Sequence, residues 1–200
     1  MSEAIDRGRR QLLTVATTLT GAVGVAFAAV PFLASWKPSA RAKALGAPVE
    51  IDISKLEPGA MLKIEWRGKP VMVVRRTPEM IAKLDSHDDT LADPASNNSR
   101  QPDYAKNPAR AIKPEFLVVL GVCTHLGCLP QNRLNPGASA DGVLNADWPG
   151  GFFCPCHGSM FDLSGRVFRG VPAPTNLEIP PYSFADSGHL VIGLDQGSAA

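Results

Sequence analysis

The chain has little net charge, few aromatic residues and few cysteines, and each shortage excludes a class of protein. Its 20 Lys and Arg nearly balance 19 Asp and Glu, which argues against a nucleic-acid binder that works through bulk positive charge. Hydrophobic residues make up 44% of the chain, which fits neither a polytopic membrane protein nor a disordered one. Only four Cys and four His occur, so their positions decide the interpretation.

Charge is also absent from one long stretch near the N-terminus. No charged residue occurs between Gln11 and Trp36, and within that stretch residues 12–34 would span about 34 Å as a helix at ~1.5 Å per residue. That length crosses a hydrocarbon core of about 30 Å. Residues 1–11 carry Arg7, Arg9 and Arg10, and positive charge favours the cytoplasmic side. The sequence therefore predicts a single transmembrane helix with a cytoplasmic N-terminus and the rest of the chain outside.

The pair Arg9-Arg10, followed by Gln-Leu-Leu, is similar to a twin-arginine export signal, which serves proteins that are exported already folded. The alternative is an ordinary signal peptide cleaved after Ala26-Phe27-Ala28. The apolar run exceeds the usual 7–15 residues of such a peptide, which favours a retained anchor. Residues 35–48 are small and basic and contain Leu45 as their one large aliphatic residue, so we expect a flexible tether there.

Residues 49–200 are expected to form a head of short strands, because Gly and Pro are abundant and apolar runs are brief. A short helix is expected to start at Thr77-Pro78-Glu79 and end near Leu84. Polar surface loops are expected over 85–114 and 132–149. The candidate strands are 49–53, 61–66, 70–74, 116–122, 151–153, 166–168, 182–185 and 189–194.

All four cysteines lie in two short runs that each contain two Cys and one His. We call Cys-Thr-His-Leu-Gly-Cys, residues 123–128, box one, and Cys-Pro-Cys-His-Gly-Ser, residues 154–159, box two. Such a pair of runs predicts a metal site. A tetrahedral zinc takes four ligands and would leave two of the six candidates spare. A two-iron, two-sulfide cluster held by two Cys and two His also takes four, and it leaves two Cys for a disulfide, which suits an exported protein.

The two boxes resemble those of the Rieske iron–sulfur proteins of cytochrome bc1 complexes, and the similarity extends to the twin-arginine anchor, the tether and the Pro-rich segment 170–174. The resemblance implies a mainly β fold: a Rieske-type antiparallel β-sandwich head, with a small cluster-binding part over about 121–175, behind one transmembrane helix. It implies one 2Fe–2S cluster. The residues implied are Cys123 and Cys154 on one iron, His125 and His157 on the other, and Cys128–Cys156 as a disulfide.

Residues around the boxes are expected to tune the cluster. The absence of side chains at Gly127 and Gly158 lets backbone N–H groups approach the sulfurs, and the Ser159 hydroxyl can donate a hydrogen bond to a sulfur. High-potential members of the family usually carry Tyr two positions after this Ser, whereas this chain has Phe161. Phe161 has no hydroxyl to donate, so we predict that Phe161→Tyr raises the midpoint potential.

The function that the resemblance implies is electron transfer in a quinol–cytochrome c oxidoreductase of the bacterial inner membrane. His157 is then the quinol contact and proton acceptor, and the head swings on its tether to deliver the electron to cytochrome c1. The implied partners are cytochrome b, cytochrome c1 and quinol, in a dimeric complex, without nucleic acid. Two alternatives are a Rieske subunit of an exported molybdenum enzyme such as arsenite oxidase, and a zinc-stabilised binding module. A soluble Rieske ferredoxin is disfavoured by the anchor and the two extra cysteines.

Other residues have an ordinary structural interpretation from the sequence. His87 is expected in a solvated loop, His189 in a strand, and Arg75-Arg76 at a solvated strand end. Trp66 and Trp148 are expected to serve packing. Residues 172–174 are expected to cover the cluster.

Overall fold

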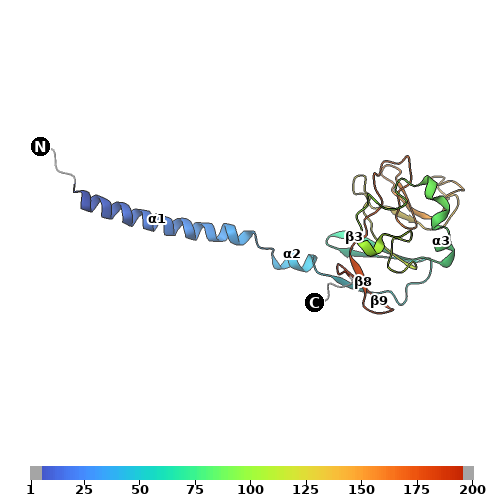
Figure 1. The fold of residues 1–200 in the computed structure, drawn as a ribbon, viewed down its shortest axis with the longest axis horizontal. Helices are drawn as coiled ribbons and strands as arrows, with labels where there is room; N and C mark the ends of the chain where they lie inside the picture. The colour runs from blue at the N-terminus through green and yellow to red at the C-terminus, as the bar shows by residue number, and fades with distance from the viewer. Residues whose placement is uncertain (1–5, 196–200) are drawn as a thin grey trace. The chain divides into compact units, whose positions relative to one another are not determined.

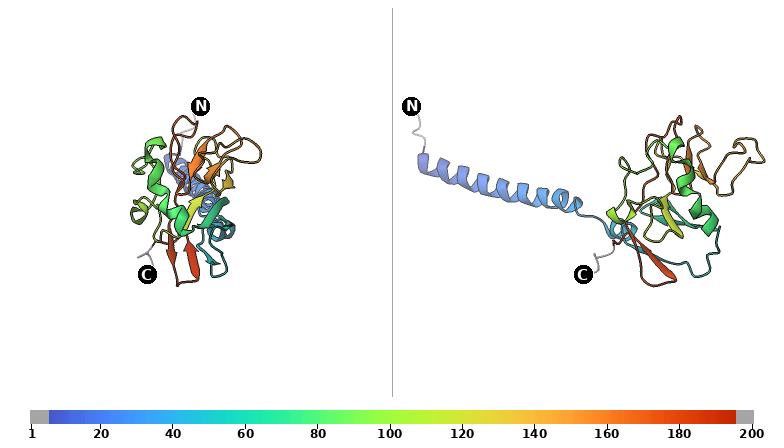
Figure 2. Two further views of the ribbon diagram at one scale, coloured as in Figure 1. Left: turned by 90° about the vertical axis from the view of Figure 1, so that its right-hand side faces the viewer. Right: turned by 45° about the vertical axis from the view of Figure 1, so that its right-hand side comes forward.

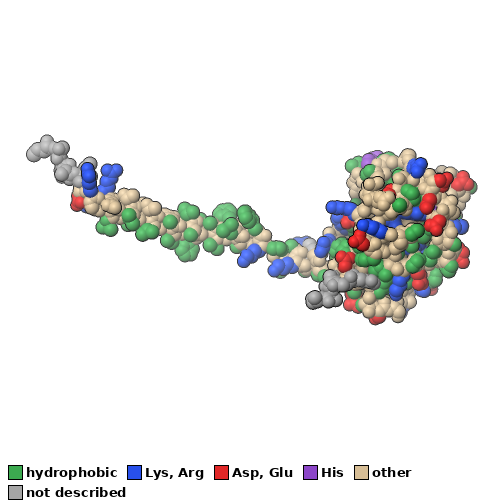
Figure 3. Space-filling view, in the orientation of Figure 1, with side chains coloured by type: hydrophobic (Ala, Val, Ile, Leu, Met, Phe, Trp, Pro, Cys, Tyr) green, Lys and Arg blue, Asp and Glu red, His purple; other side chains and the backbone are tan. Residues whose placement is uncertain are grey.

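The computed structural model describes residues 6–195, and the chain divides into two units, Met1–Ala44 and Leu45–Ala200. The first unit is dominated by the long helix α1 (Arg7–Ser35). The Asp6 side chain caps it by accepting a hydrogen bond from the Arg9 N–H. Within the unit no residue of α1 is buried, and hydrophobic side chains lie exposed along its length (Figure 3). By length and composition this helix can cross a membrane.

The threonine hydroxyl groups of α1 form their hydrogen bonds within the helix and need no water. The hydroxyls of Thr14, Thr17, Thr18 and Thr20 each donate a hydrogen bond to the carbonyl four residues earlier, at 2.7–2.8 Å. A polar group in hydrocarbon costs free energy unless it has a partner. These bonds therefore make the threonines compatible with an apolar surrounding.

The range expected to be a flexible tether contains a short helix, α2 (Ala40–Leu45). Ser39 starts it, because its hydroxyl oxygen accepts from the Ala42 N–H at 3.1 Å and its carbonyl accepts from the Lys43 N–H at 3.0 Å. A serine at a helix start satisfies backbone N–H groups that have no partner inside the helix. The segment is therefore not irregular throughout.

The head consists of three antiparallel three-stranded sheets, with strand orders β1-β9-β8, β2-β3-β4 and β5-β6-β7 (Figure 1). The mainly β architecture expected from the sequence is confirmed. The strands are β1 (Val49–Asp52), β2 (Met61–Trp66), β3 (Lys69–Arg75), β4 (Phe116–Leu120), β5 (Gln131–Arg133), β6 (Gly151–Phe153), β7 (Met160–Asp162), β8 (Tyr182–Phe184) and β9 (His189–Ile192).

The core forms where β3 packs between its neighbours. Every residue of β4 is buried, as are the four residues 71–74 of β3, because both strands are continuous apolar runs without polar alternation. A two-residue turn joins β2 to β3, with positive φ at Arg67 and at Gly68. That turn matches the twist of the hairpin and favours glycine at its second position. Trp66 is also buried, as expected.

The first and last strands of the head are neighbours. β1 pairs with β9 from Val49↔Ile192 to Asp52↔His189, and β8 pairs with the other side of β9. Figure 2 shows these strands side by side at one end of the head. The strand that follows the tether is thus held by the last strand of the head.

The expectation of a polar surface loop over 85–114 is only partly right, because several of its side chains are buried. This segment contains two short 3-10 helices, η1 (Leu84–Thr90) and η2 (Asp103–Ala105), and the side chains of Leu91, Ala105 and Arg110 are buried. The expected short helix is present as α3 (Pro78–Ala82), capped by the Thr77 hydroxyl. The polar composition suggested a solvated loop, but polar side chains such as Asp93 and Arg110 are buried and hydrogen-bonded inside the head.

One further expectation needs correction. The range 166–168 is not a strand, since only Val167 and Phe168 form isolated bridges. The third strand of the small sheet is β7, which begins directly after box two. Gly151 of β6 makes this pairing close: a Cβ there would lie 2.0 Å from the Phe161 carbonyl oxygen. Only glycine fits such an approach.

Candidate metal centre

Both boxes are loops that end in a strand of one small sheet. Box one leads from β4 to β5, and box two connects β6 to β7. Because β5, β6 and β7 are hydrogen-bonded neighbours, the sheet brings together two loops that are about 30 residues apart in the chain.

The two loops have the same backbone hydrogen bonds. In box one the Cys123 N–H donates to the Cys128 carbonyl at 2.8 Å, and the Gly127 N–H donates to the Cys123 carbonyl at 2.9 Å. In box two the equivalent bonds run from Cys154 to Ser159 at 2.7 Å and from Gly158 to Cys154 at 3.0 Å. The fifth residue of each box is a glycine with positive φ, 86° and 75° respectively, which L side chains adopt at a cost.

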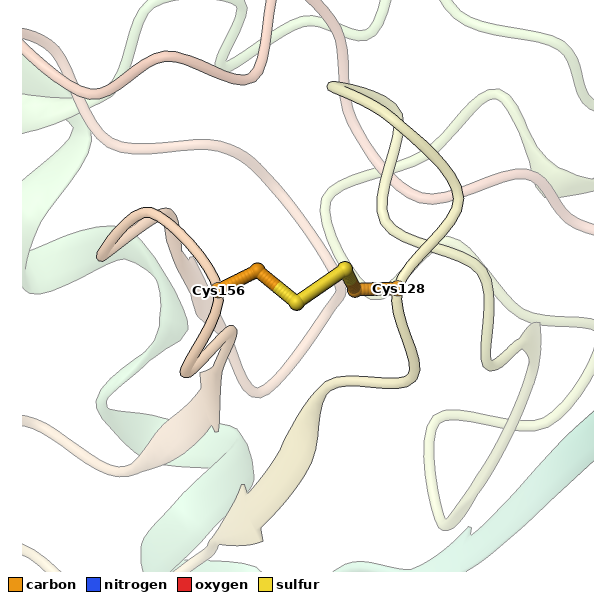
Figure 4. The surroundings of a disulfide bond; sticks show 2 residues. All are labelled: Cys128 and Cys156. Carbon is orange, nitrogen blue, oxygen red and sulfur yellow. A yellow bond between two sulfur atoms is a disulfide. The ribbon is translucent and has the colours of Figure 1, made fainter.

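A disulfide between Cys128 and Cys156 joins the two loops, with Cα atoms 6.6 Å apart (Figure 4). The implied pairing is therefore confirmed. Cys154 Sγ lies within 4.8 Å of both disulfide sulfurs. These three sulfurs do not form a ligand set, because bonded sulfurs are not thiolates.

The two remaining cysteines face each other inside the head. Cys123 and Cys154 are both unbonded and each is only 2% exposed. Burial raises the pKa of the Cys123 thiol and contact with the Cys154 thiol adds to the rise, while hydrogen bonds from the His125 backbone N–H and the Ser159 hydroxyl act against it. A cation at this position would instead favour the thiolates.

The two box histidines also face each other. Their ring centroids are 4.8 Å apart and the rings are nearly perpendicular, at 84°. His125 is half-buried, whereas His157 is exposed. Each box thus contributes one buried thiol and one outer imidazole, and like groups are paired across the two loops. Two thiolates and two neutral imidazoles are the donors that hold a 2Fe–2S cluster of the mixed type, so the residues present fit this group.

The Pro-rich segment 170–174 and Thr175 directly after it are hydrogen-bonded to the two boxes. The Ala173 N–H donates to the Ser159 hydroxyl oxygen at 3.0 Å, and the Thr124 hydroxyl donates to the Thr175 carbonyl at 2.6 Å. Ser159 is fully buried. Because its oxygen accepts from Ala173, its own hydrogen remains to be donated toward the Cys123 sulfur.

A buried ion cluster behind box two was not predicted from the sequence. Asp162, the last residue of β7, is fully buried and accepts hydrogen bonds from Arg166 Nε at 2.8 Å and from the Ser164 and Arg166 N–H groups. Burial alone would raise the pKa of Asp162, but the contacts with His87 and Arg166 outweigh it and the pKa is lowered. Arg166 also binds the Leu84 carbonyl and Asp88.

His87 belongs to this cluster, so its expected place in a solvated loop is wrong. Its Nε2 lies 3.3 Å from Asp162 Oδ2, its side chain is 13% exposed, and its ring stacks on Phe168 with centroids 5.8 Å apart. His189 is a strand residue as expected, paired with Asp186. Trp148 is buried and donates to the Arg133 carbonyl. Nothing in the sequence around His87 indicates its contact with Asp162, because the two residues are 75 positions apart.

Two further arginines hold the turn that follows β7. Arg110, fully buried, donates to the carbonyls of Ser164, Gly165 and Leu177. Arg76, 1% exposed, donates to the carbonyls of Pro114 and Leu163. Burial lowers the pKa of each guanidinium to about 10, so both stay charged at neutral pH. The expectation that Arg76 is solvated is therefore wrong: its Nε and Nη1 bind protein oxygens, and its buried Nη2 has no hydrogen-bond partner among the described residues.

Comparisons with known proteins agree with this site. A family model described as "Rieske [2Fe-2S] domain" matches residues 48–182, and one described as "Ubiquitinol-cytochrome C reductase Fe-S subunit TAT signal" matches residues 1–39. The second match bears out the twin-arginine interpretation.

Two curated relatives cover nearly the whole chain. The ubiquinol–cytochrome c reductase iron–sulfur subunit of Allochromatium vinosum is 58% identical over 99% of this chain and 94% of its own length. The subunit of the same name from Blastochloris viridis is 44% identical over 96% of each chain. A solved hyperthermophilic respiratory Complex III chain is 28% identical over 88% of this chain and 98% of its own, with a TM-score of 0.47. The two curated relatives favour the first of the three functions expected from the sequence.

Proposed function

The chain belongs to the family of Rieske iron–sulfur subunits of ubiquinol–cytochrome c reductase, and we propose which residues hold its cluster and how they act. As a member it is a membrane-anchored subunit of a cytochrome bc1 complex and transfers electrons from quinol. The proposal concerns the ligands, the quinol contact, the direct partners and the orientation in the membrane.

Cys123 and Cys154 bind one iron, and His125 and His157 bind the other. The observation that carries this assignment is the like-with-like pairing: two buried thiols in contact, and two imidazoles 4.8 Å apart. The other two cysteines are consumed by the disulfide, so they are not available as ligands. Neutral imidazoles in place of thiolates remove negative charge, which makes such a cluster easier to reduce.

His157 is the quinol contact. The bound cluster supplies a one-electron acceptor. The His157 imidazole is exposed. With one ring nitrogen on iron, the other would accept a hydrogen bond from a quinol hydroxyl, and take its proton, in the deprotonated form of the ring. The thiol side of the centre is buried, which keeps water from the sulfurs. The exposed ring would therefore place the proton acceptor beside the electron acceptor that the bound cluster would supply.

The direct partners are cytochrome b, where quinol is oxidised, and cytochrome c1, which receives the electron, in a dimeric complex. The N-terminal Arg7, Arg9 and Arg10 are cytoplasmic and the head is periplasmic, because positive charge is retained on the cytoplasmic side. Residues 35–48 form the tether that lets the head move between the two partners, and residues 172–174 cover the cluster.

Magnetic resonance of the reduced holoprotein tests the ligand assignment. With 15N-labelled histidine, we expect hyperfine coupling from two nitrogens. His157→Ala should abolish the cluster signal, whereas the matched control His189→Gln, outside the boxes, should retain both couplings. A cluster that survives His157→Ala, or coupling from a single nitrogen, would contradict the assignment.

The tether is tested by stiffening it within the assembled complex. Replacing residues 42–47 by a Pro-rich stretch should leave the cluster signal intact and slow electron transfer from quinol to cytochrome c, because the head can no longer reach both partners. A Gly/Ser replacement of the same length is the control and should turn over normally. Equal rates in both variants would mean that the head does not move on this segment.

A further inference from the structure

Three cations directly after the membrane helix have no role in the head or in the predicted orientation. Lys37, Arg41 and Lys43 are exposed, and among the residues that the structure describes none of the three has an ion-pair partner. No acidic residue occurs between Asp6 and Glu50. Positive charge on the outer side also works against the rule that orients such helices, so these cations need another explanation.

The geometry of α2 suits a helix that lies on a membrane surface. At about 100° per residue, Ala40 and Ala44 share one face of α2, and Arg41 and Lys43 lie on opposite flanks of that face. Such a helix can place its small apolar face toward lipid while the long cationic side chains reach sideways to the phosphates. Ser39 fixes the start of α2 through its hydroxyl and carbonyl, so this arrangement is set locally.

The cations also lie within reach of the headgroups. α1 ends at Ser35, and Trp36 follows with 82% of its surface exposed, as suits an aromatic ring at the interface. Lys37 comes next, and Arg41 and Lys43 follow within two helical turns. Figure 3 shows Lys and Arg side chains at both ends of the apolar length of this helical region.

We propose that Lys37, Arg41 and Lys43 bind the phosphates of anionic phospholipids in the outer leaflet and hold α2 on the membrane surface. The inference rests on the proposed orientation of the chain and deepens the proposed role of the tether. The tether then has a lipid-bound and a released state, and movement of the head requires release. Each cation near an anionic surface strengthens binding about fivefold, and salt weakens it by screening.

Amide hydrogen exchange of α2 tests this inference on the full-length holoprotein. The protein is placed in nanodiscs of phosphatidylcholine alone or of phosphatidylcholine with phosphatidylglycerol. We expect the amides of α2 to exchange about fivefold more slowly per engaged cation in the anionic discs, and added salt to remove the difference. Equal exchange in the two lipids would overturn the inference.

Charge variants separate a specific contact from a general effect of the lipid. The double variant Arg41→Gln/Lys43→Gln should lose most of the slowing. The matched control Lys63→Gln/Lys69→Gln removes two exposed cations of the head and should keep it. Slow exchange that persists in the first variant would overturn the inference. So would protection that arises only in the assembled complex, which would assign the cations to an acidic protein partner.

The cluster signal of the same nanodiscs separates the two proposals. A sample with an intact two-nitrogen cluster signal and lipid-independent exchange refutes only the lipid contact. A sample that lacks the two-nitrogen signal refutes the ligand assignment, whatever the exchange shows.

Discussion

The two cluster loops share a backbone and differ in the side chains that it carries. Each closes with the same two hydrogen bonds and turns at a glycine in the fifth position. The first position is a buried cysteine in both. The fourth position is exposed in both, as Leu126 in box one and His157 in box two, and the sixth is Cys128 in one and the buried Ser159 in the other. The backbone thus sets which positions face inward, and the side chains divide the chemistry.

The largest expected effect comes from comparing positions one and four. Cys123→Ala and Cys154→Ala should both abolish the cluster, because each removes one of four protein ligands. At position four, His157→Ala should abolish it while Leu126→Ala should retain it. Iron content and the magnetic resonance signal of the reduced protein report the outcome. Loss of the cluster in Leu126→Ala would mean that the fourth position supports the cluster by packing, so that loss in His157→Ala would not by itself identify a ligand.

The disulfide makes the loops depend on each other. Cys128→Ser and Cys156→Ser should have equal effects, since each breaks the same bond, which closes a loop of 28 residues. We expect a loss of about 3–4 kcal/mol in the free energy of unfolding, together with faster loss of the cluster. Urea unfolding of the oxidised protein measures this. The wild type treated with a reductant is the control and should resemble the variants, and mass spectrometry that finds both thiols free in the native protein would refute the idea.

The shared turn should respond alike in both loops. Gly127→Ala and Gly158→Ala each force an alanine into positive φ, although open space surrounds both sites, so each should cost roughly 1–2 kcal/mol of stability. Gly142→Ala is the control, because it has positive φ and open space outside the boxes. It should lose similar stability without loss of cluster. If the alanine lowered stability in one box and left it unchanged in the other, the two turns would not be equivalent.

The smallest expected effect is a shift in midpoint potential on changing Phe161, which follows box two in β7 and has no counterpart after box one. Phe161 is fully buried in β7, opposite Phe152. If its ring faces the cysteine sulfur, Phe161→Tyr should raise the midpoint potential, because a hydroxyl hydrogen bond stabilises the more negative reduced state. Ser159→Ala should lower it. Protein-film voltammetry at matched cluster content measures both shifts. An unchanged or lower midpoint in the tyrosine variant would mean that this position does not face the sulfur.

The sequence predicted the parts of the head that depend on local patterns. The run of apolar residues in β4, the hairpin turn at Arg67-Gly68 and the capped start of α3 follow from periodicity and turn chemistry. The spacing within the boxes identified the six residues that the structure brings together. Each of these signals lies within a few residues of the feature it predicts.

What escaped prediction depends on contacts across the chain. Arg110 lies among polar residues that are typical of a surface loop, yet its guanidinium reaches carbonyls 54–67 residues away. His87 meets Asp162 across 75 residues. A buried charge is stable only with such partners, and nothing near either residue in the sequence indicates that the partners exist.

The pairing of β1 with β9 has a consequence for the order in which the protein is made. β1 begins at Val49 and has its one strand partner, among the described residues, in the last strand of the head. During synthesis β1 leaves the ribosome early and waits unpaired until residues 189–192 have followed. The carbonyl partners of Arg110 at residues 164, 165 and 177 also emerge after it. The sheet β1-β9-β8 and the burial of Arg110 therefore complete only after the last strand of the head has been made, whereas β2, β3 and β4 can pair before it.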